Sequence, residues 1–160
     1  MRKTALIIPY FKINSFKKLF KDRKTVLVGG CFDLIHAGHI DYLSKSASLG
    51  DKFIVAVNSD SSVKKIKGPG RPINDEKTRI YVLSSFFFTD AVVLFDDETP
   101  YELICKIIPD ILVKGGDYGE DEIVGGDVVK KTGGKVVILP YIEGYSTSTI
   151  IDKIRGKSSG

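Results

Sequence analysis

Cysteine and histidine are scarce in this sequence, with two of each among 160 residues. Cys31 and Cys105 form no C-x-x-C pair and no zinc-like spacing, so reduced thiols are expected. No run approaches the roughly 18 apolar residues of a membrane span. The start MRKTALIIPYF contains Pro9, meets Lys12 and lacks a small-residue cleavage site, which argues against a signal peptide. A cytoplasmic protein with no membrane partner is therefore predicted.

A strong charge of one sign is also missing. The formal net charge is +4, and the lysines of FKKLFKDRK and VKKIK lie apart and alternate with apolar residues. This fits an anionic small-molecule substrate and falls short of the basic surface of a nucleic-acid-binding protein, so no nucleic-acid partner is predicted. The hydrophobic content of 42% and the chain length suit one globular domain with its own core.

Compact apolar runs alternate along the chain with helical patterns. Strands are predicted at residues 25–30, 52–57, 91–95, 110–114 and 135–140. Helices are predicted at residues 38–49, 75–88, 99–108, 121–132 and 147–155. Strands without polar alternation suit a parallel sheet that is covered on both faces. The pattern predicts an α/β fold, a Rossmann-like doubly wound parallel five-stranded sheet with helices on both faces.

Three segments are expected. Residues 1–23 would form a helical extension, with an amphipathic helix at 10–23, residues 24–155 the main domain, and residues 156–160 a flexible tail. In a doubly wound sheet, ligands bind beyond the carboxyl ends of the strands. The segments that follow the predicted strands include CFDLIHAGH, NSDSSVKKIKGPGRP, GGDYGEDE and IEGYSTST. None contains the G-x-G-x-x-G dinucleotide fingerprint or a phosphate-binding P-loop, which disfavours dinucleotide oxidoreductases and P-loop kinases.

Both histidines, His36 and His39, lie in VGGCFDLIHAGHIDYL, directly after the first predicted strand. A metal site would need further ligands, and only Cys31 and Asp33 are near. Structural histidines are a second interpretation, and an anion site is a third. If a helix begins between them, the two rings flank its N-terminus, where free N–H groups attract phosphate. Gly38 has no Cβ, so a phosphate can approach the backbone closely.

The stretch GCFDLIHAGHIDYL resembles the G-x-F-D-x-x-H-x-G-H signature of the nucleotidylyltransferase superfamily. Further along, LGDKFIVAVNSDSSVKKIKGPGRPIN, DILVKGGDY and EGYSTSTII resemble, in order, the adenylyltransferase domain of bifunctional ADP-heptose synthases. This resemblance covers roughly residues 24–155. It implies transfer of AMP from ATP to D-glycero-β-D-manno-heptose 1-phosphate, giving ADP-heptose for lipopolysaccharide core and pyrophosphate. It also implies Mg²⁺ bound with ATP, a homodimer, and a separate heptose 7-phosphate kinase upstream, since the chain has no room for a kinase domain.

The resemblance also assigns residues to roles. The catalytic residues would be His36, His39 and Lys67. ATP would contact Gly30, Cys31, Phe32, His36, Gly38, His39, Lys114, Gly115, Asp117, Tyr145, Ser146 and Thr147. The sugar phosphate would contact Asp33, Asn58, Asp60, Arg71 and Arg79, and no residue is expected to hold a resident metal. The sugar-phosphate oxygen would attack the α-phosphorus of ATP in line, with the histidines stabilising the developing charge.

Several residues keep a second interpretation. The hydroxyls of STST (146–149) can bind triphosphate oxygens or cap the last helix. Asp33 can order its turn or contact the sugar. Lys67 and Arg71 lie in a glycine-proline loop and can clamp phosphates or be solvated, and Arg79 can reach a phosphate or form a surface ion pair.

Two other functions stay open. A cytidylyltransferase that makes a CDP-alcohol such as CDP-glycerol shares the histidine motif, but such enzymes carry an arginine where this chain has Tyr141. A non-catalytic nucleotide-binding protein on the same fold is the other alternative, because fold alone does not establish activity.

Overall fold

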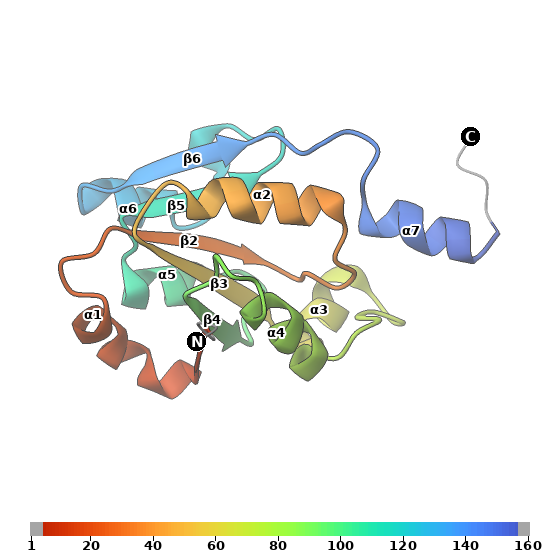
Figure 1. Ribbon diagram of the computed structural model, residues 1–160, viewed down its shortest axis with the longest axis horizontal. Coiled ribbons are helices and arrows are strands. Elements are labelled where there is room, and N and C mark those ends of the chain that lie inside the picture. Colours follow the sequence, from red (N-terminus) through yellow and green to blue (C-terminus); the bar gives the residue numbers. More distant parts are fainter. Residues whose placement is uncertain (1–4, 157–160) are drawn as a thin grey trace.

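The computed structural model describes residues 5–156, so residues 157–160 of the predicted tail lie outside the described residues. The core of the protein is one six-stranded sheet in the order β1-β4-β3-β2-β5-β6, and every neighbouring pair is parallel. The strands are β1 (Leu6–Ile8), β2 (Thr25–Gly30), β3 (Lys52–Asn58), β4 (Ala91–Phe95), β5 (Ile111–Gly115) and β6 (Lys135–Leu139). The predicted parallel α/β fold is confirmed (Figure 1).

The prediction of five strands was wrong by one, because β1 adds an edge strand from the N-terminal segment. Leu6 pairs with Ala91, and its N–H donates to the carbonyl of Asp90 at 2.9 Å. Only three residues long and ended before Pro9, this strand gives too short a signal to be recognised from sequence. The N-terminal segment therefore extends the sheet, besides contributing helical turns.

The helices are α1 (Phe16–Leu19), α2 (Ala37–Ala47), α3 (Asp60–Lys67), α4 (Glu76–Ser84), α5 (Tyr101–Ile107), α6 (Gly126–Lys131) and α7 (Thr147–Ile154), with 3-10 turns at Tyr10–Ser15 and Glu120–Glu122. The single helix predicted at 10–23 is replaced by the first 3-10 turn and the four-residue α1. The helix α3 was not predicted, because its polar residues give a weak helical pattern. Ser59 caps it by accepting a hydrogen bond from the N–H of Ser62.

Two buried clusters lie on opposite faces of the sheet because strand residues alternate in direction. On one face, Val28 and Val55 pack with Leu43 of α2 and Leu83 of α4. On the other, Leu27 and Ile54 pack with α5, α6 and two residues of the N-terminal segment, Ile13 and Phe20. This two-faced arrangement is the predicted doubly wound architecture (Figure 1). Among residues 5–156, no helix has the length and apolar character needed to cross a membrane.

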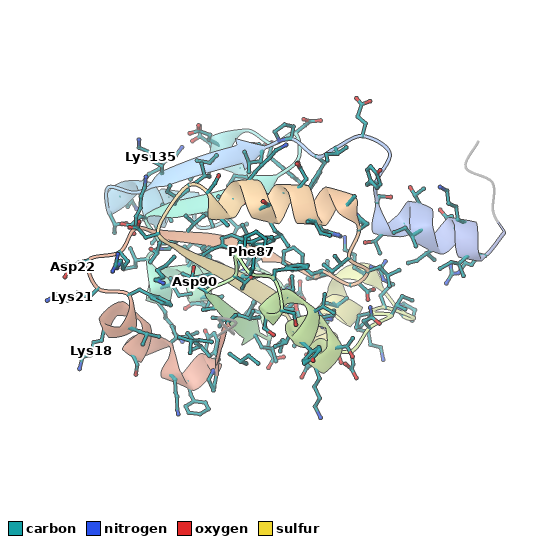
Figure 2. The ribbon with its side chains drawn as sticks, in the orientation of Figure 1. Lys18, Lys21, Asp22, Phe87, Asp90 and Lys135 are labelled. Carbon is teal, nitrogen blue, oxygen red and sulfur yellow. The ribbon has the colours of Figure 1, made fainter. Side chains whose placement is uncertain are left out.

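The strand order reverses at β2, which pairs with β3 on one side and β5 on the other. The carboxyl ends of these three strands meet at the end of the sheet near α7 (Figure 1). Lys18, Lys21 and Lys135 lie at the opposite end, where the strands begin (Figure 2). The basic N-terminal segment is thus far from the place where a doubly wound sheet binds its ligand.

Candidate active site

A cavity of about 390 Å³ opens at the carboxyl ends of β2, β3 and β5. The predicted site residues that line it are Gly30, Cys31, Phe32, Asp33, His39, Asn58, Lys67, Lys114 and Thr147. The sequence separates these residues by more than a hundred positions, and the sheet topology brings them together. The cavity is therefore where the chemistry of the predicted site can take place.

The two histidines mark the beginning of α2. His36 is its N-cap residue, with extended backbone, and His39 lies in the first turn. Their ring centroids are 3.9 Å apart with the planes tilted by 32°. Neither Nδ1 atom has a hydrogen-bond partner among the described residues, although both atoms are buried. Two buried ring nitrogens without partners at a helix N-terminus are suited to bind a ligand with hydrogen-bonding oxygens.

Both histidines favour the neutral form more than a free imidazole does. Burial, aided by the neighbouring His36, lowers the pKa of His39 to about 4. Burial also lowers the pKa of His36. An anion placed beside the rings would favour their protonated forms and raise both pKa values. The pair can therefore bind a phosphate as neutral hydrogen-bonding groups and gain protons as negative charge accumulates.

Phe32 and Gly38 fix the surroundings of this pair. Phe32 has a left-handed backbone, with φ of 49°, which is uncommon for a bulky residue and tends to occur at functional sites. Its ring meets His39 edge to face, with centroids 5.7 Å apart. A Cβ on Gly38 would lie 3.1 Å from the His36 ring and 3.2 Å from the Cβ of Tyr145. Glycine is thus needed at position 38 for close packing, in addition to the predicted approach of a phosphate.

The N-terminus of α7 faces the same cavity. Ser146 caps this helix by accepting a hydrogen bond from the N–H of Thr149 at 3.0 Å. Thr147 lines the cavity, and its hydroxyl donates to the carbonyl of Leu34 at 3.3 Å. Tyr145 stacks against His36, with centroids 6.3 Å apart. The hydroxyl-rich start of α7 is in this way tied to the loop that carries the histidines.

Two lysines approach the cavity from opposite sides of β2. Lys67 ends α3, which follows β3, and Lys114 lies in β5. Burial, together with the positive charge of Lys67, lowers the pKa of Lys114. Burial raises the pKa of the Cys31 thiol, which keeps it protonated between them. The two ammonium groups are the cations available for phosphate oxygens in the described cavity lining.

Tyr141 forms the wall of the cavity above β5. Its ring lies so close to Gly115 that a Cβ there would overlap it. It also meets Tyr42 edge to face, with centroids 5.8 Å apart, and the Tyr42 hydroxyl donates to the carbonyl of Val113 at 3.2 Å. Gly115 therefore serves the site by making room for this aromatic wall.

Asp33, predicted to contact the sugar, is engaged within the protein. Its carboxylate accepts hydrogen bonds from Nε of Arg71 at 2.6 Å and from the backbone N–H groups of Ile73 and Asn74. Burial would raise the pKa of Asp33, but these donors hold it below its usual value. Its side chain is only 1% exposed. In this structure Asp33 and Arg71 order the loop before α4.

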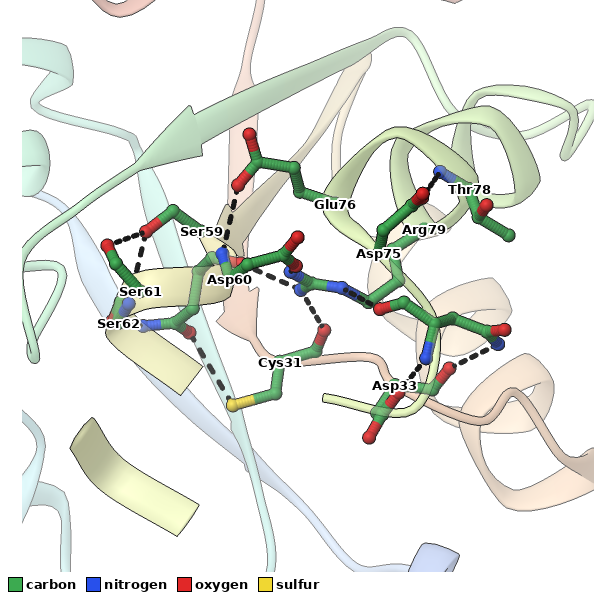
Figure 3. A network of polar contacts seen from close by, with 12 residues as sticks. Cys31, Asp33, Ser59, Asp60, Ser61, Ser62, Asp75, Glu76, Thr78 and Arg79 are labelled. Atoms are coloured by element: carbon green, nitrogen blue, oxygen red, sulfur yellow. Dashed lines mark hydrogen bonds and ion pairs between the residues drawn. The ribbon is translucent and has the colours of Figure 1, made fainter. Parts of the chain in front are cut away.

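Arg79 is buried and does not belong to the lining of this cavity, and Figure 3 shows the polar contacts around it. Its Nη1 donates to the carbonyls of Cys31 and Asn58, both at 2.7 Å. Its Nη2 donates to the carboxylate of Asp60 at 2.8 Å, and its Nε to the carbonyl of Asn74 at 3.1 Å. These contacts join the ends of β2 and β3 to the starts of α3 and α4. In the described contacts Arg79 therefore has a structural role, and Asp60 is its ion-pair partner.

Asn58 is held in the cavity wall by this network, because its Nδ2 donates to Ser62 Oγ at 2.9 Å. Asp117 is exposed and does not belong to the cavity lining. Further residues line the cavity that were not predicted as site residues: Gly29, Tyr42, Ile66, Phe95, Glu98, Pro100 and Tyr118. The rule that ligands bind beyond the carboxyl ends of the strands could have identified Phe95, Glu98 and Pro100, because they lie at and after the end of β4.

The described residues contain no group of three or more His, Cys, Asp or Glu side chains that could hold a metal ion. Of the two carboxylates in the described cavity lining, Asp33 is occupied by protein donors, which leaves Glu98 as a single open carboxylate. A divalent cation in this cavity would therefore have to take most of its ligands from a substrate and from water.

The sequence pattern of the cytidylyltransferase-like family matches residues 27–153. This chain belongs to that family. The match begins in β2 and ends in α7, so it includes every element that lines the cavity. The nucleotidylyltransferase resemblance of the histidine motif is thereby confirmed.

Individual relatives of this cytidylyltransferase-like chain agree with the more detailed resemblance. The bifunctional protein HldE of Campylobacter jejuni subsp. doylei is 53% identical over 151 residues, which are 91% of this chain and 32% of the relative. The HldE protein of Photobacterium profundum is 54% identical over 131 residues, which are 82% of this chain and 28% of the relative. The chain thus spans about a third of the length of these relatives.

Solved structures share the architecture. A lipopolysaccharide core biosynthesis protein from Thermoplasma volcanium has a TM-score of 0.62 and 29% identity, covering 78% of this chain and 99% of the other. A pantoate-β-alanine ligase from Francisella tularensis has a TM-score of 0.61 and 16% identity, covering 94% of this chain and 77% of the other. The second similarity concerns the fold alone.

Proposed function

We propose that this protein transfers AMP from ATP to D-glycero-β-D-manno-heptose 1-phosphate, giving ADP-heptose and pyrophosphate. The observation that carries the proposal is the pair of half-buried histidines at the N-terminus of α2, whose buried Nδ1 atoms have no partner among the described residues. The choice of substrates is supported by the identity of about half of the aligned residues with HldE proteins and by the resemblance to the adenylyltransferase domain of ADP-heptose synthases.

The reaction needs no nucleophile from the protein. An oxygen of the sugar phosphate attacks the α-phosphorus of ATP, and the bond from that phosphorus to the bridging oxygen breaks, so that pyrophosphate leaves with the electron pair. The attacking phosphate is already deprotonated at neutral pH, so no strong base is required. His36 and His39 donate hydrogen bonds to the phosphoryl oxygens on which charge accumulates, while Lys67 and Lys114 offset the charge of the leaving group.

The start of α7 would complete the triphosphate site with the hydroxyls of Ser146 and Thr147. We propose that Mg²⁺ arrives with ATP, since magnesium commonly binds substrate phosphates and keeps several waters. When bound, Mg²⁺ would neutralise charge on the triphosphate.

The second candidate is a cytidylyltransferase that acts on an alcohol phosphate. It is supported by the match to the cytidylyltransferase-like family. Against it stands Tyr141, an aromatic ring in the cavity wall at the position where such enzymes carry an arginine.

We also propose a homodimer in the cytoplasm. Sedimentation velocity tests the dimer, with a single species of the protomer mass as the contradicting result.

The deciding experiment measures pyrophosphate release with Mg²⁺, crossing ATP and CTP against heptose 1-phosphate and glycerol 3-phosphate. Turnover confined to ATP with the heptose phosphate is the expected result. Turnover with CTP and glycerol 3-phosphate would retain the histidine mechanism and overturn the substrate. Tight ATP binding without turnover on any acceptor would favour a non-catalytic nucleotide-binding protein.

A further inference from the structure

The cavity contains one carboxylate that the protein leaves free. Its described lining includes two acidic side chains, Asp33 and Glu98. Asp33 is saturated by Arg71 and by the N–H groups of the following loop. Glu98, in the loop between β4 and α5, is exposed and makes no hydrogen bond or ion pair with any residue of the described chain. Its oxygens are therefore available to a ligand.

Glu98 lies where the main cavity meets a second one. This second cavity has a volume of about 250 Å³ and shares Gly29, Glu98, Pro100, Lys114 and Tyr118 with the first. Its remaining lining is largely apolar or uncharged, apart from Glu122. The carboxylate of Glu122 is engaged, because it accepts a hydrogen bond from the N–H of Gly119 at 2.7 Å. Glu98 is thus the free acid at the passage between the two spaces.

A carboxylate at this position determines which kind of chemical group can bind beside it. A phosphate beside it would be repelled, since both groups are negative. The phosphates belong near His39, Lys67 and Thr147, where hydrogen-bonding groups and cations gather. An ionised carboxylate only accepts hydrogen bonds, so a neutral group that binds beside Glu98 has to carry donors. The hydroxyl groups of a sugar meet this requirement.

We infer that Glu98 is a specificity-determining residue that accepts hydrogen bonds from hydroxyl groups of the acceptor sugar, with the second cavity enclosing the carbons farthest from the phosphate. The inference rests on the proposed function and adds to it a residue and a place for the sugar. The amino group of a nucleotide base would also satisfy a carboxylate. The sugar is favoured because Asn58, in the wall of the same cavity, is a residue expected to contact it.

The test compares Glu98→Gln and Glu98→Ala with the wild-type protein. Glu102→Gln is the matched control, because Glu102 is an exposed acid in the first turn of α5 and lines neither cavity. Steady-state pyrophosphate release gives the KM of each substrate. Isothermal titration with a non-hydrolysable ATP analogue present gives the Kd of heptose 1-phosphate. Thermal unfolding confirms that the variants are folded, as expected for an exposed side chain.

Loss of a hydrogen bond to a charged group predicts a rise of about ten- to a hundredfold in the KM and Kd of heptose 1-phosphate for Glu98→Ala. A smaller rise is expected for Glu98→Gln, while the KM of ATP stays within about twofold and the control behaves as wild type. Unchanged sugar affinity, or a loss confined to ATP, would overturn the inference although wild-type turnover upholds the proposed function. A wild-type protein that binds the sugar phosphate without turnover would overturn the proposed function, and the Kd of the variants would still decide the role of Glu98.

Discussion

His36 and His39 face each other at the beginning of α2, with ring centroids 3.9 Å apart. Because a helix N-terminus is positive and both rings are partly removed from water, the neutral form of each imidazole is favoured over its protonated form. The arrangement leaves two buried Nδ1 atoms without a partner among the described residues.

His39→Ala is expected to lower kcat by about a hundred- to a thousandfold, corresponding to roughly 3–4 kcal/mol, as for the loss of one donor to a developing oxyanion. Pyrophosphate release under saturating substrates measures it. Far-ultraviolet circular dichroism checks that the variant is folded. A folded His39→Ala protein with near wild-type kcat would remove His39 from the catalytic machinery.

The lowered pKa of His39, about 4 in the folded state against 6.5 for its usual value, predicts a pH-dependent stability. Between these two values the unfolded chain binds more protons, so the free energy of unfolding falls as the pH falls from 6.5 towards 4. The size of the shift sets an upper limit of about 3 kcal/mol for the contribution of His39, which the partial exposure of the ring reduces, and somewhat more than half of it is lost between pH 7.5 and 5. Urea unfolding at pH 7.5, 6 and 5 measures it.

The control for this pH dependence is His39→Gln, which keeps a polar side chain and cannot titrate. Other groups, Asp33 among them, lose stabilisation in acid in both proteins. Subtracting the curve of the variant therefore isolates His39. Parallel curves for the two proteins would contradict a depressed pKa at this residue.

Arg79→Met is expected to destabilise the fold by roughly 3–5 kcal/mol, because it leaves Asp60 and three backbone carbonyls without their donor. Asp60→Asn should cost less than Arg79→Met, because an amide oxygen can still accept from the buried Arg79 and the side chain of Asp60 is 40% exposed. Urea unfolding compares the two. Wild-type stability of Arg79→Met, combined with a raised KM for the sugar phosphate, would instead support the direct phosphate contact expected from sequence.

Gly115→Ala is expected to displace Tyr141, because the added Cβ would overlap its ring. Because the overlapping atoms are the ring end of a half-exposed side chain that can move aside, the cost should stay below the about 1–3 kcal/mol of an overpacked core. The cost should largely disappear in the Tyr141→Ala background, which a double-mutant cycle of unfolding free energies measures. Equal costs in both backgrounds would show that the ring does not limit space at position 115.

The sequence by itself determined the parallel α/β architecture and the place of the site. Five strands were recognised within one residue of their bounds, because strands buried on both faces are continuous apolar runs. The histidine motif was recognised as well, since its residues are local and adjoin the end of the first long strand. The helix α3 and the strand β1 were missed, one because it is polar and the other because three residues carry little periodicity.

Only the tertiary structure decided which polar side chains are engaged by other residues of the protein and which are left to bind a ligand. Asp33 and Arg79 are both charged residues near strand ends, and the sequence gives each an open choice between substrate and structure. The fold brings donors and acceptors from Cys31 to Asn74 around them, and buried charges take the partners that lie within reach. Glu98 has no such partner in the described chain and faces the cavity. Which charges are satisfied depends on contacts between residues distant in sequence, which no local pattern specifies.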